Sequence, residues 1–173
     1  MDISAAQVKE LRDKTGAGIM DCKRALTESG GNMEKAEEAL KQKGLLQHAK
    51  VAGREAKQGV IESYIHTGGR IGALVEINCE TDFVARTDEF RTLAREIAMQ
   101  VASMNPKTVG TLDGNEGEDA LLSQEYIRDS RRTIRDLIKE AIGKLRENIV
   151  VSRFMRFEVG VAPDSSEGES SED

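Results

Sequence analysis

The spacing of apolar residues in the first quarter of the chain predicts three short helices. Ser4 and Gln7 match the capping box that opens the first helix. The second occupies residues 19–29, after a glycine-rich break. Asn32 can cap the third helix, and we expect Gly44 to end it. Three helices of this length predict a small helical bundle.

The pattern then changes to the alternation of apolar and polar residues that is typical of strands. It predicts a hairpin formed by strands 60–67 and 71–79. Helical spacing returns over 88–104, and a long helix is expected over 121–147. A last strand follows at 149–159. The sequence therefore predicts an α+β layer, a three-stranded antiparallel sheet with helices on one face.

The two faces of this sheet differ in their expected surroundings. Odd-numbered residues of strand 71–79 are expected to face the helices. In the last strand, the residues expected on the same face are Ile149, Val151, Met155, Phe157 and Val159. The opposite face carries Leu74, Val150 and Phe154. An apolar outer face requires a cover, and a second copy of the chain is a reasonable candidate for it.

The chain therefore divides into three expected parts. Residues 1–57 form a helical domain similar to ubiquitin-associated domains, with a basic connector from Lys50 onward. Residues 58–162 form the α+β domain, and 163–173 form an acidic tail too polar to fold alone. That tail holds five of the 31 acidic residues, and the rest of the chain balances 26 acidic against 25 basic residues. This near-neutral body argues against direct binding of nucleic acid through counterion release.

Several other classes of protein also lack support in the sequence. No apolar run is long enough to cross a membrane, and we expect a cytoplasmic protein. The two cysteines are far apart, which favours neither a disulfide framework nor a metal site. His48 and His66 are expected at the surface, and no phosphate-binding loop or catalytic motif is present. We therefore expect neither an enzyme nor a cofactor.

The best candidate for function is the turn between strand 71–79 and helix 88–104. It places the aromatic Phe83 and the acidic Asp82 between two rigid elements. In one interpretation Phe83 plugs the end of the core and Asp82 caps the turn. In the other, Phe83 points outward as a wedge for a partner protein.

Met20 in the second helix is a further candidate. Helical geometry places it well away from Ile19, Cys22, Ala25 and Leu26, which cluster on the side expected to be buried. Isolated exposed apolar residues are common and usually carry no function. Methionine is nevertheless favoured at adaptable contact surfaces, so a partner contact stays open.

Three segments of the chain resemble one known family. Residues 8–26 (VKELRDKTGAGIMDCKRAL) closely resemble the N-terminal signature of bacterial elongation factor Ts, and residues 75–85 (VEINCETDFVA) resemble its second signature. Residues 149–160 are similar to the C-terminal strand of that family. The resemblance implies a guanine nucleotide exchange factor for elongation factor Tu, the GTPase that delivers aminoacyl-tRNA to the ribosome.

The resemblance also assigns roles to residues. It implies that the helical domain docks on the GTPase through Lys9, Arg12 and Met20. It further implies that the Thr81, Asp82, Phe83 and Val84 turn enters near the Mg²⁺ site of elongation factor Tu. The chain has room for one core subdomain, as in the short form of the family, in which two copies pair through their sheets. That pairing predicts a homodimer through Leu74, Val150 and Phe154.

Two other classes of function remain to be compared with nucleotide exchange. One is a homodimeric adaptor that uses its helical bundle to bind peptides or proteins. The other is RNA binding, which the neutral body and only six aromatic residues, four Phe and two Tyr, disfavour.

Overall fold

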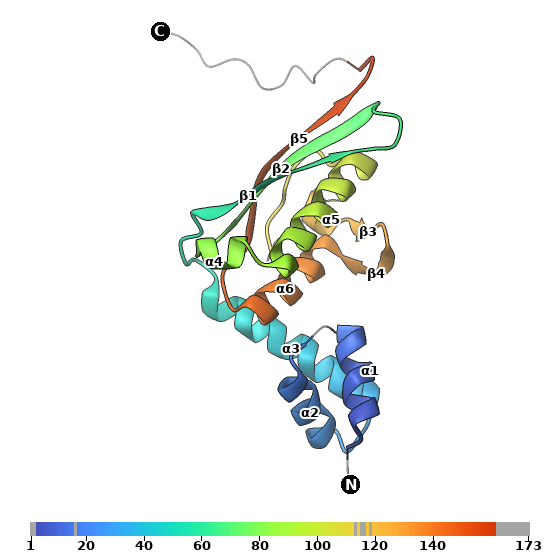
Figure 1. Ribbon diagram of the computed structural model, residues 1–173, viewed down its shortest axis with the longest axis vertical. Helices are drawn as coiled ribbons and strands as arrows, with labels where there is room; N and C mark the ends of the chain where they lie inside the picture. Colours follow the sequence, from blue (N-terminus) through green and yellow to red (C-terminus); the bar gives the residue numbers. More distant parts are fainter. Residues whose placement is uncertain (1–2, 16, 113, 115–116, 118, 162–173) are drawn as a thin grey trace.

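The computed structural model describes residues 3–15, 17–112, 114, 117 and 119–161. Its first part is a bundle of three helices, α1 (Ala5–Thr15), α2 (Ile19–Glu28) and α3 (Met33–Val51) (Figure 1). The expected caps are present. The Gln7 amide donates to Ser4 Oγ at 3.2 Å, and the Lys35 amide donates to Asn32 Oδ1 at 2.9 Å. The bundle core is small and is formed by Val8, Leu11, Cys22, Ala25, Leu26 and Ala36.

Helix α3 is longer than the sequence pattern predicts. The expectation that Gly44 ends it is wrong, because the helix continues to Val51. Val51 is fully buried in the core of the second part of the chain, and α3 contacts α6 there. A glycine inside a helix costs only about 1 kcal/mol relative to alanine, so this packing outweighs it. One helix therefore joins the bundle to the sheet (Figure 1).

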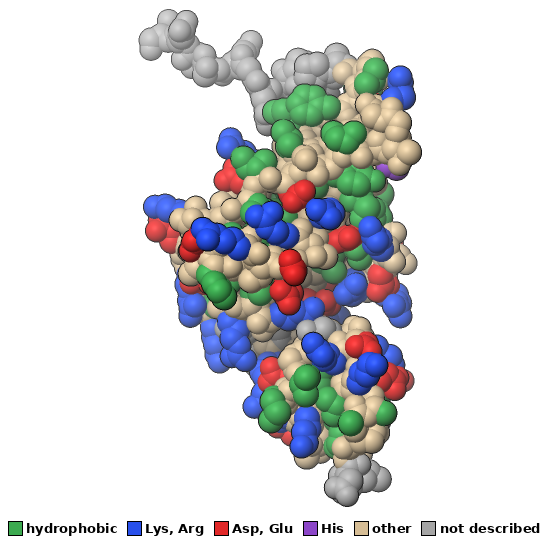
Figure 2. Space-filling view, in the orientation of Figure 1, with side chains coloured by type: hydrophobic (Ala, Val, Ile, Leu, Met, Phe, Trp, Pro, Cys, Tyr) green, Lys and Arg blue, Asp and Glu red, His purple; other side chains and the backbone are tan. Residues whose placement is uncertain are grey.

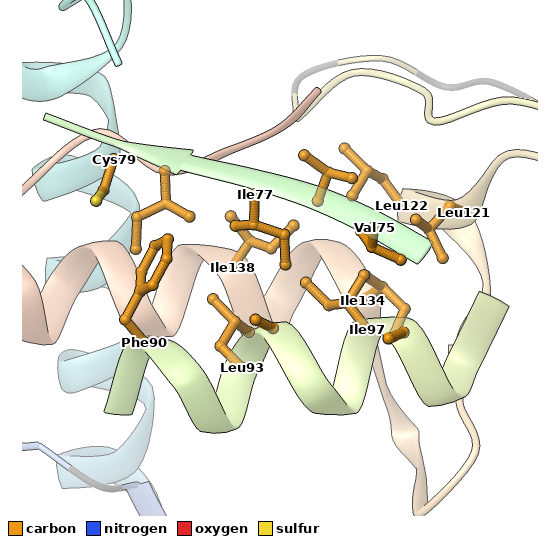
Figure 3. Packing of buried hydrophobic residues seen from close by; sticks show 14 of the residues in the cluster. Val75, Ile77, Cys79, Phe90, Leu93, Ile97, Leu121, Leu122, Ile134 and Ile138 are labelled. Carbon is orange, nitrogen blue, oxygen red and sulfur yellow. The ribbon is translucent and has the colours of Figure 1, made fainter. Parts of the chain in front are cut away.

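The second part is an α+β layer, as predicted. Strands β1 (Gln58–Ile65), β2 (Ile71–Cys79) and β5 (Val150–Glu158) form an antiparallel sheet in the order β1-β2-β5. Helices α4 (Asp82–Ala85), α5 (Asp88–Met104) and α6 (Ile134–Leu145) complete this layer. Figure 3 shows side chains from β2, α5 and α6 pointing toward one another in the core, among them Val75, Ile77, Phe90, Leu93, Ile97, Ile134 and Ile138.

The prediction of one long helix over 121–147 is wrong for the first half of that range. The chain instead forms a 3-10 turn (Leu121–Ser123) and a small hairpin of β3 (Glu125–Tyr126) and β4 (Asp129–Thr133) before α6 begins. The fully buried Gln100 side chain holds the hairpin. Its Nε2 donates to the Glu125 carbonyl at 3.0 Å, and its Oε1 accepts from the Ile127 amide at 3.0 Å. These contacts come from α5, so local periodicity could not indicate them.

The assignment of faces in the last strand is also partly wrong. Glu76 pairs with Arg153 but Ile77 pairs with Val151, so Ser152 is an extra residue that forms a β-bulge. The bulge reverses the alternation of side chains beyond it. Phe154 consequently packs against the core, whereas Met155 and Phe157 lie on the outer face and are 54% and 58% exposed.

Four side chains form what we call the outer patch: Ile65, Leu74, Met155 and Phe157. The register brings Leu74 opposite Met155, and places Gly72 between Ile65 and Phe157. All four side chains are exposed. Val150 is also on the outer face, but the ion pair of Arg153 with Glu76, at 2.7 Å, lies between it and the patch. Figure 2 shows hydrophobic side chains gathered over the end of the sheet far from the helical bundle.

Among the helices of the described part of the chain, none is long and apolar enough to cross a membrane. The acidic tail at 163–173 lies outside the described residues.

Candidate partner-binding site

The candidate turn is a single helical turn held between two longer elements. Strand β2 ends at Cys79, and Thr81 caps α4 by accepting a hydrogen bond from the Val84 amide at 3.3 Å. Thr87 then caps α5, its hydroxyl accepting from the Phe90 amide at 3.3 Å. Thr81, and not Asp82, is therefore the capping residue of the turn. Two helix caps in seven residues define the path of the backbone.

Phe83 projects from this turn into solvent. Its side chain is 78% exposed, whereas the next residue, Val84, is only 6% exposed and belongs to the core. The interpretation in which Phe83 plugs the core is thus excluded. Asp82 is also exposed and forms an ion pair with Arg86 at 2.9 Å. Of the four predicted contact residues, Thr81, Asp82 and Phe83 have exposed side chains, while Val84 is buried and anchors the turn.

Glu147, which is far from the turn in sequence, holds the turn through hydrogen bonds. The sequence offered no signal for this contact. One carboxylate oxygen accepts hydrogen bonds from the amides of Glu80 and Thr81, at 3.1 and 3.0 Å. The other oxygen accepts from the Thr81 hydroxyl at 2.6 Å. Glu147 is 66 residues from Thr81 in the chain. Only the folded sheet and α6 bring it there.

A second set of hydrogen bonds reinforces this arrangement. The amide of Asn148 donates to Glu80 Oε1 at 2.7 Å, and its side-chain amide donates to the carbonyl of Arg54 at 2.7 Å. Arg54 also approaches Glu80, with 3.5 Å between their charged atoms. Asn148 is 6% exposed, so these bonds satisfy a buried polar side chain. They connect the turn to the segment that follows α3.

Cys79 lies directly beneath the turn, and its thiol donates to the Thr81 carbonyl at 3.2 Å. Burial, and secondly the charge of Glu147, raise the pKa of Cys79 to about 11. The thiol is therefore protonated at neutral pH and is not a nucleophile. Cys79 contributes packing and one weak hydrogen bond.

The helical bundle presents its own candidate surface. Met20 is 75% exposed, in agreement with its expected position away from the buried side of α2. Ile19 is 55% exposed, so its assignment to the buried side is wrong. Two adjacent apolar residues thus lie at the solvent-exposed start of α2. Lys9 and Arg12 are exposed on α1.

The remaining candidate chemistry is sparse. Within the described ranges, no group of three or more His, Cys, Asp or Glu side chains could hold a metal ion. His66 is exposed and its Nδ1 lies 3.1 Å from the Tyr64 hydroxyl. The side chain of His48 lies outside the described residues. The features that remain are the exposed Phe83 turn and the exposed start of α2.

Comparison with known proteins agrees with this description. The family described as elongation factor TS matches residues 33–116, a range that includes β2, the candidate turn and α5. Elongation factor Ts of Thermoanaerobacter sp. (strain X514) is 48% identical over 203 residues, which cover 96% of this chain and 100% of that protein. Elongation factor Ts of Caldanaerobacter subterraneus is 50% identical over 194 residues, with 91% and 97% covered. Elongation factor Ts of Coprothermobacter proteolyticus is 48% identical over 196 residues, with 92% and 100% covered.

A helical bundle joined to an α+β layer, with relatives of this kind along nearly its whole length, defines an elongation factor of protein biosynthesis. The chain belongs to the elongation factor Ts family. The first of these alignments spans 203 positions, more than the 173 residues of the chain, so that relative contains segments with no counterpart here.

Proposed function

We propose that this protein is a guanine nucleotide exchange factor for elongation factor Tu and that Phe83 is its wedge. The observation that carries this proposal is the exposure of Phe83, 78%, on a turn whose backbone is capped and clamped. A large aromatic side chain on a rigid protein surface is the kind of residue that anchors interfaces. Because the turn is already ordered, binding costs little conformational entropy there.

The physical basis of exchange would be displacement of the nucleotide's metal ion. Mg²⁺ bridges the phosphates of a bound guanine nucleotide and neutralises their charge. Insertion of Phe83, with Asp82 beside it, would shift the groups around that ion and weaken the binding of both ion and nucleotide. No covalent step is needed. The chemistry supplied by this chain is steric and electrostatic.

Thermodynamic linkage determines the direction of exchange. A factor that weakens nucleotide binding must itself be bound more weakly when nucleotide is present, and by the same ratio. The protein would therefore bind the nucleotide-free GTPase best, and an entering nucleotide would expel it. It would accelerate the approach to equilibrium without selecting GTP over GDP.

The helical bundle would supply a separate docking contact. Met20 lies exposed at the start of α2, and Lys9 and Arg12 are exposed on α1. An adaptable apolar side chain and basic side chains on the same bundle suit a partner with an apolar surface and acidic groups. We assign docking on the GTPase to these residues, and displacement of the nucleotide's metal ion to the Phe83 turn.

We also propose that two copies pair through the outer face of the sheet. The outer patch leaves four large apolar side chains exposed, with Val150 farther along the same face. Phe157, and not Phe154 as the sequence predicted, is the phenylalanine of the last strand that lies on the proposed dimer face. Burial of a large apolar side chain contributes roughly 1.5–3 kcal/mol before the entropy of association is subtracted. Four such side chains can support a dimer at micromolar concentrations.

The decisive experiment measures release of labelled GDP from purified elongation factor Tu with and without this protein. We expect release to accelerate with protein concentration and to reach a plateau. A capture experiment from cytosol adds a control, since the GTPase should be a major partner and should be lost when GDP and Mg²⁺ are added in excess. An adaptor that binds through its helical bundle would retain its partner under those conditions and leave GDP release unchanged.

A further inference from the structure

The connection between α6 and β5 spans residues 146–149. Two of these residues, Glu147 and Asn148, form hydrogen bonds with the start of the candidate turn. Helix α6 ends at Leu145, and Arg146 takes a left-handed conformation with φ of 60°. The amide of Arg146 donates to the Ile142 carbonyl at 2.8 Å, which terminates the helix. This abrupt end directs the next residue, Glu147, toward the start of α4.

Glu147 uses both carboxylate oxygens on one short segment. Its three bonds, from the Glu80 amide, the Thr81 amide and the Thr81 hydroxyl, are between 2.6 and 3.1 Å long. The Thr81 hydroxyl that donates to Glu147 also accepts from the Val84 amide. A chain of hydrogen bonds thus runs from Glu147 through the cap of α4 to the residue that follows Phe83.

The contact between these segments is reciprocal. Glu80 donates its amide to Glu147 and accepts from the amide of Asn148, at 2.7 Å. The two backbones are therefore held in register by side-chain carboxylates on both sides. Bonds to an ionised acceptor are stronger than bonds between neutral groups. Glu147 accepts through both oxygens, so its replacement by an amide would place an N–H group where an acceptor is required.

We propose that Glu147 is the positioning residue for the Phe83 wedge. This inference rests on the exchange function proposed above. Glu147 acts through Thr81 and the cap of α4, and it keeps the free protein in the conformation that presents Phe83. Without this clamp the presenting conformation is only a fraction of the population, and the apparent affinity for the GTPase falls by that fraction.

The first test compares Glu147→Gln with a matched control, Glu125→Gln, which removes an exposed carboxylate on β3. GDP release from elongation factor Tu is followed across a range of factor concentrations. For Glu147→Gln we expect the factor concentration that gives half-maximal release to rise about tenfold, with a nearly unchanged rate at saturation. The control should match the parent protein. An unchanged half-maximal concentration for Glu147→Gln would overturn the proposal.

The second test asks whether Glu147 acts through Phe83. In a Phe83→Ala background, Glu147→Gln should have almost no further effect, because there is no wedge left to position. Independent, additive effects would show that Glu147 has only a structural role or its own partner contact. Failure of Phe83→Ala itself to slow exchange would instead contradict the exchange proposal. The two failures are thereby distinguished.

A third measurement needs no partner. Hydrogen exchange of the Glu80 and Thr81 amides should be slow in the parent protein and faster in Glu147→Gln, while the amides of β2 remain protected. If Glu147→Gln unfolds, Glu147→Asp serves in its place, since it keeps the charge but withdraws the carboxylate by one methylene. Equal exchange of both amides in parent and variant would show that the clamp is absent in solution.

Discussion

At the scale of single residues, neighbours in the chain have opposite surroundings in this protein. Phe83 and Val84 are adjacent on α4, yet one is 78% exposed and the other 6%. Successive helical positions differ by about 100° around the axis, which accounts for the contrast. The larger and more apolar residue is the exposed one, so simple burial of hydrophobic surface does not explain its direction. The cap at Thr81 and its clamp by Glu147 set that direction.

Phe83→Ala should slow GDP release by about tenfold or more, the loss expected on truncation of an interfacial anchor. Its effect on the free energy of unfolding should stay within about 0.5 kcal/mol, since the side chain is exposed. Circular dichroism melts and exchange kinetics measure the two effects together. Ile127→Ala, which removes another exposed apolar side chain, should leave the exchange rate unchanged. Wild-type exchange with a lowered melting temperature would contradict the assignment.

Met20→Asp should weaken docking without unfolding the bundle, because Met20 is exposed on α2. We expect the concentration of factor needed for half-maximal exchange to rise about tenfold. The melting temperature should change by no more than a degree or two. Thr27→Asp, which adds a charge elsewhere on the same helix, is the control and should retain exchange. A large drop in melting temperature for Met20→Asp would show that the residue packs in the bundle.

Because of Cys79, we expect the free energy of unfolding to depend on pH in the alkaline range. Its pKa is raised to about 11 in the folded state, so the folded protein keeps a proton that the unfolded chain has released. Stability from this thiol is therefore present below pH ~8.5, the ordinary pKa, and is lost as the pH rises toward 11. Urea unfolding at pH 8 and 10.5 measures the loss. In Cys79→Ala the difference between the two pH values should shrink, and an equal difference would contradict this account.

At the scale of elements, caps and tertiary contacts determine where helices begin. Apolar periodicity extends before residue 134, but α6 starts only at Ile134. Thr133 and Asp136 form a reciprocal capping box there. The Thr133 amide donates to Asp136 Oδ2 at 2.9 Å, and the Asp136 amide donates to the Thr133 hydroxyl at 3.2 Å. Gln100 on α5 fixes the preceding hairpin.

Thr133→Ala should destabilise the protein by about 1 kcal/mol, the usual cost of removing a helix cap. For a chain of this size that corresponds to a fall in melting temperature of roughly 2–4 °C. Ser130→Ala, on the same strand and exposed, should change the melting temperature little. Equal melting temperatures for Thr133→Ala and the parent would mean that the capping box does not limit stability.

At the scale of the whole molecule, helix α3 and an ion pair connect the helical bundle to the α+β layer. Helix α3 runs from the bundle, where Ala36 is buried, to the main core, where Val51 is buried. Arg146 at the end of α6 also lies 4.0 Å from Asp21 on α2. Such an exposed ion pair contributes little free energy. The continuous helix is therefore the main determinant of how the docking surface and the Phe83 turn are placed relative to each other.

Phe157→Glu should convert the proposed dimer to a monomer, because it places a charge within the apolar outer patch. Light scattering at tens of micromolar protein measures the change in mass. Thr92→Glu adds the same charge to the exposed side of α5 and should leave the dimer intact. A parent protein that is monomeric at that concentration would disprove pairing through the outer patch.

The sequence by itself determined most of the elements and the class of fold. The helices at 19–28 and 88–104 and strand 71–79 follow from apolar periodicity, capping residues and glycine breaks, all of which act within a few residues. The signature around Phe83 and the exposure of Met20 were accessible for the same reason, since both depend on local helix geometry and a short motif.

Only the tertiary structure decided the remaining features. The bulge at Ser152 turned Phe154 inward and Phe157 outward, and a one-residue insertion of this kind leaves no mark on the apolar pattern. Val51 keeps α3 helical beyond Gly44 through contacts with the main core. Glu147 reaches Thr81 across 66 positions of sequence. Each of these depends on which distant segments lie side by side, and that is decided by the packing of the complete chain.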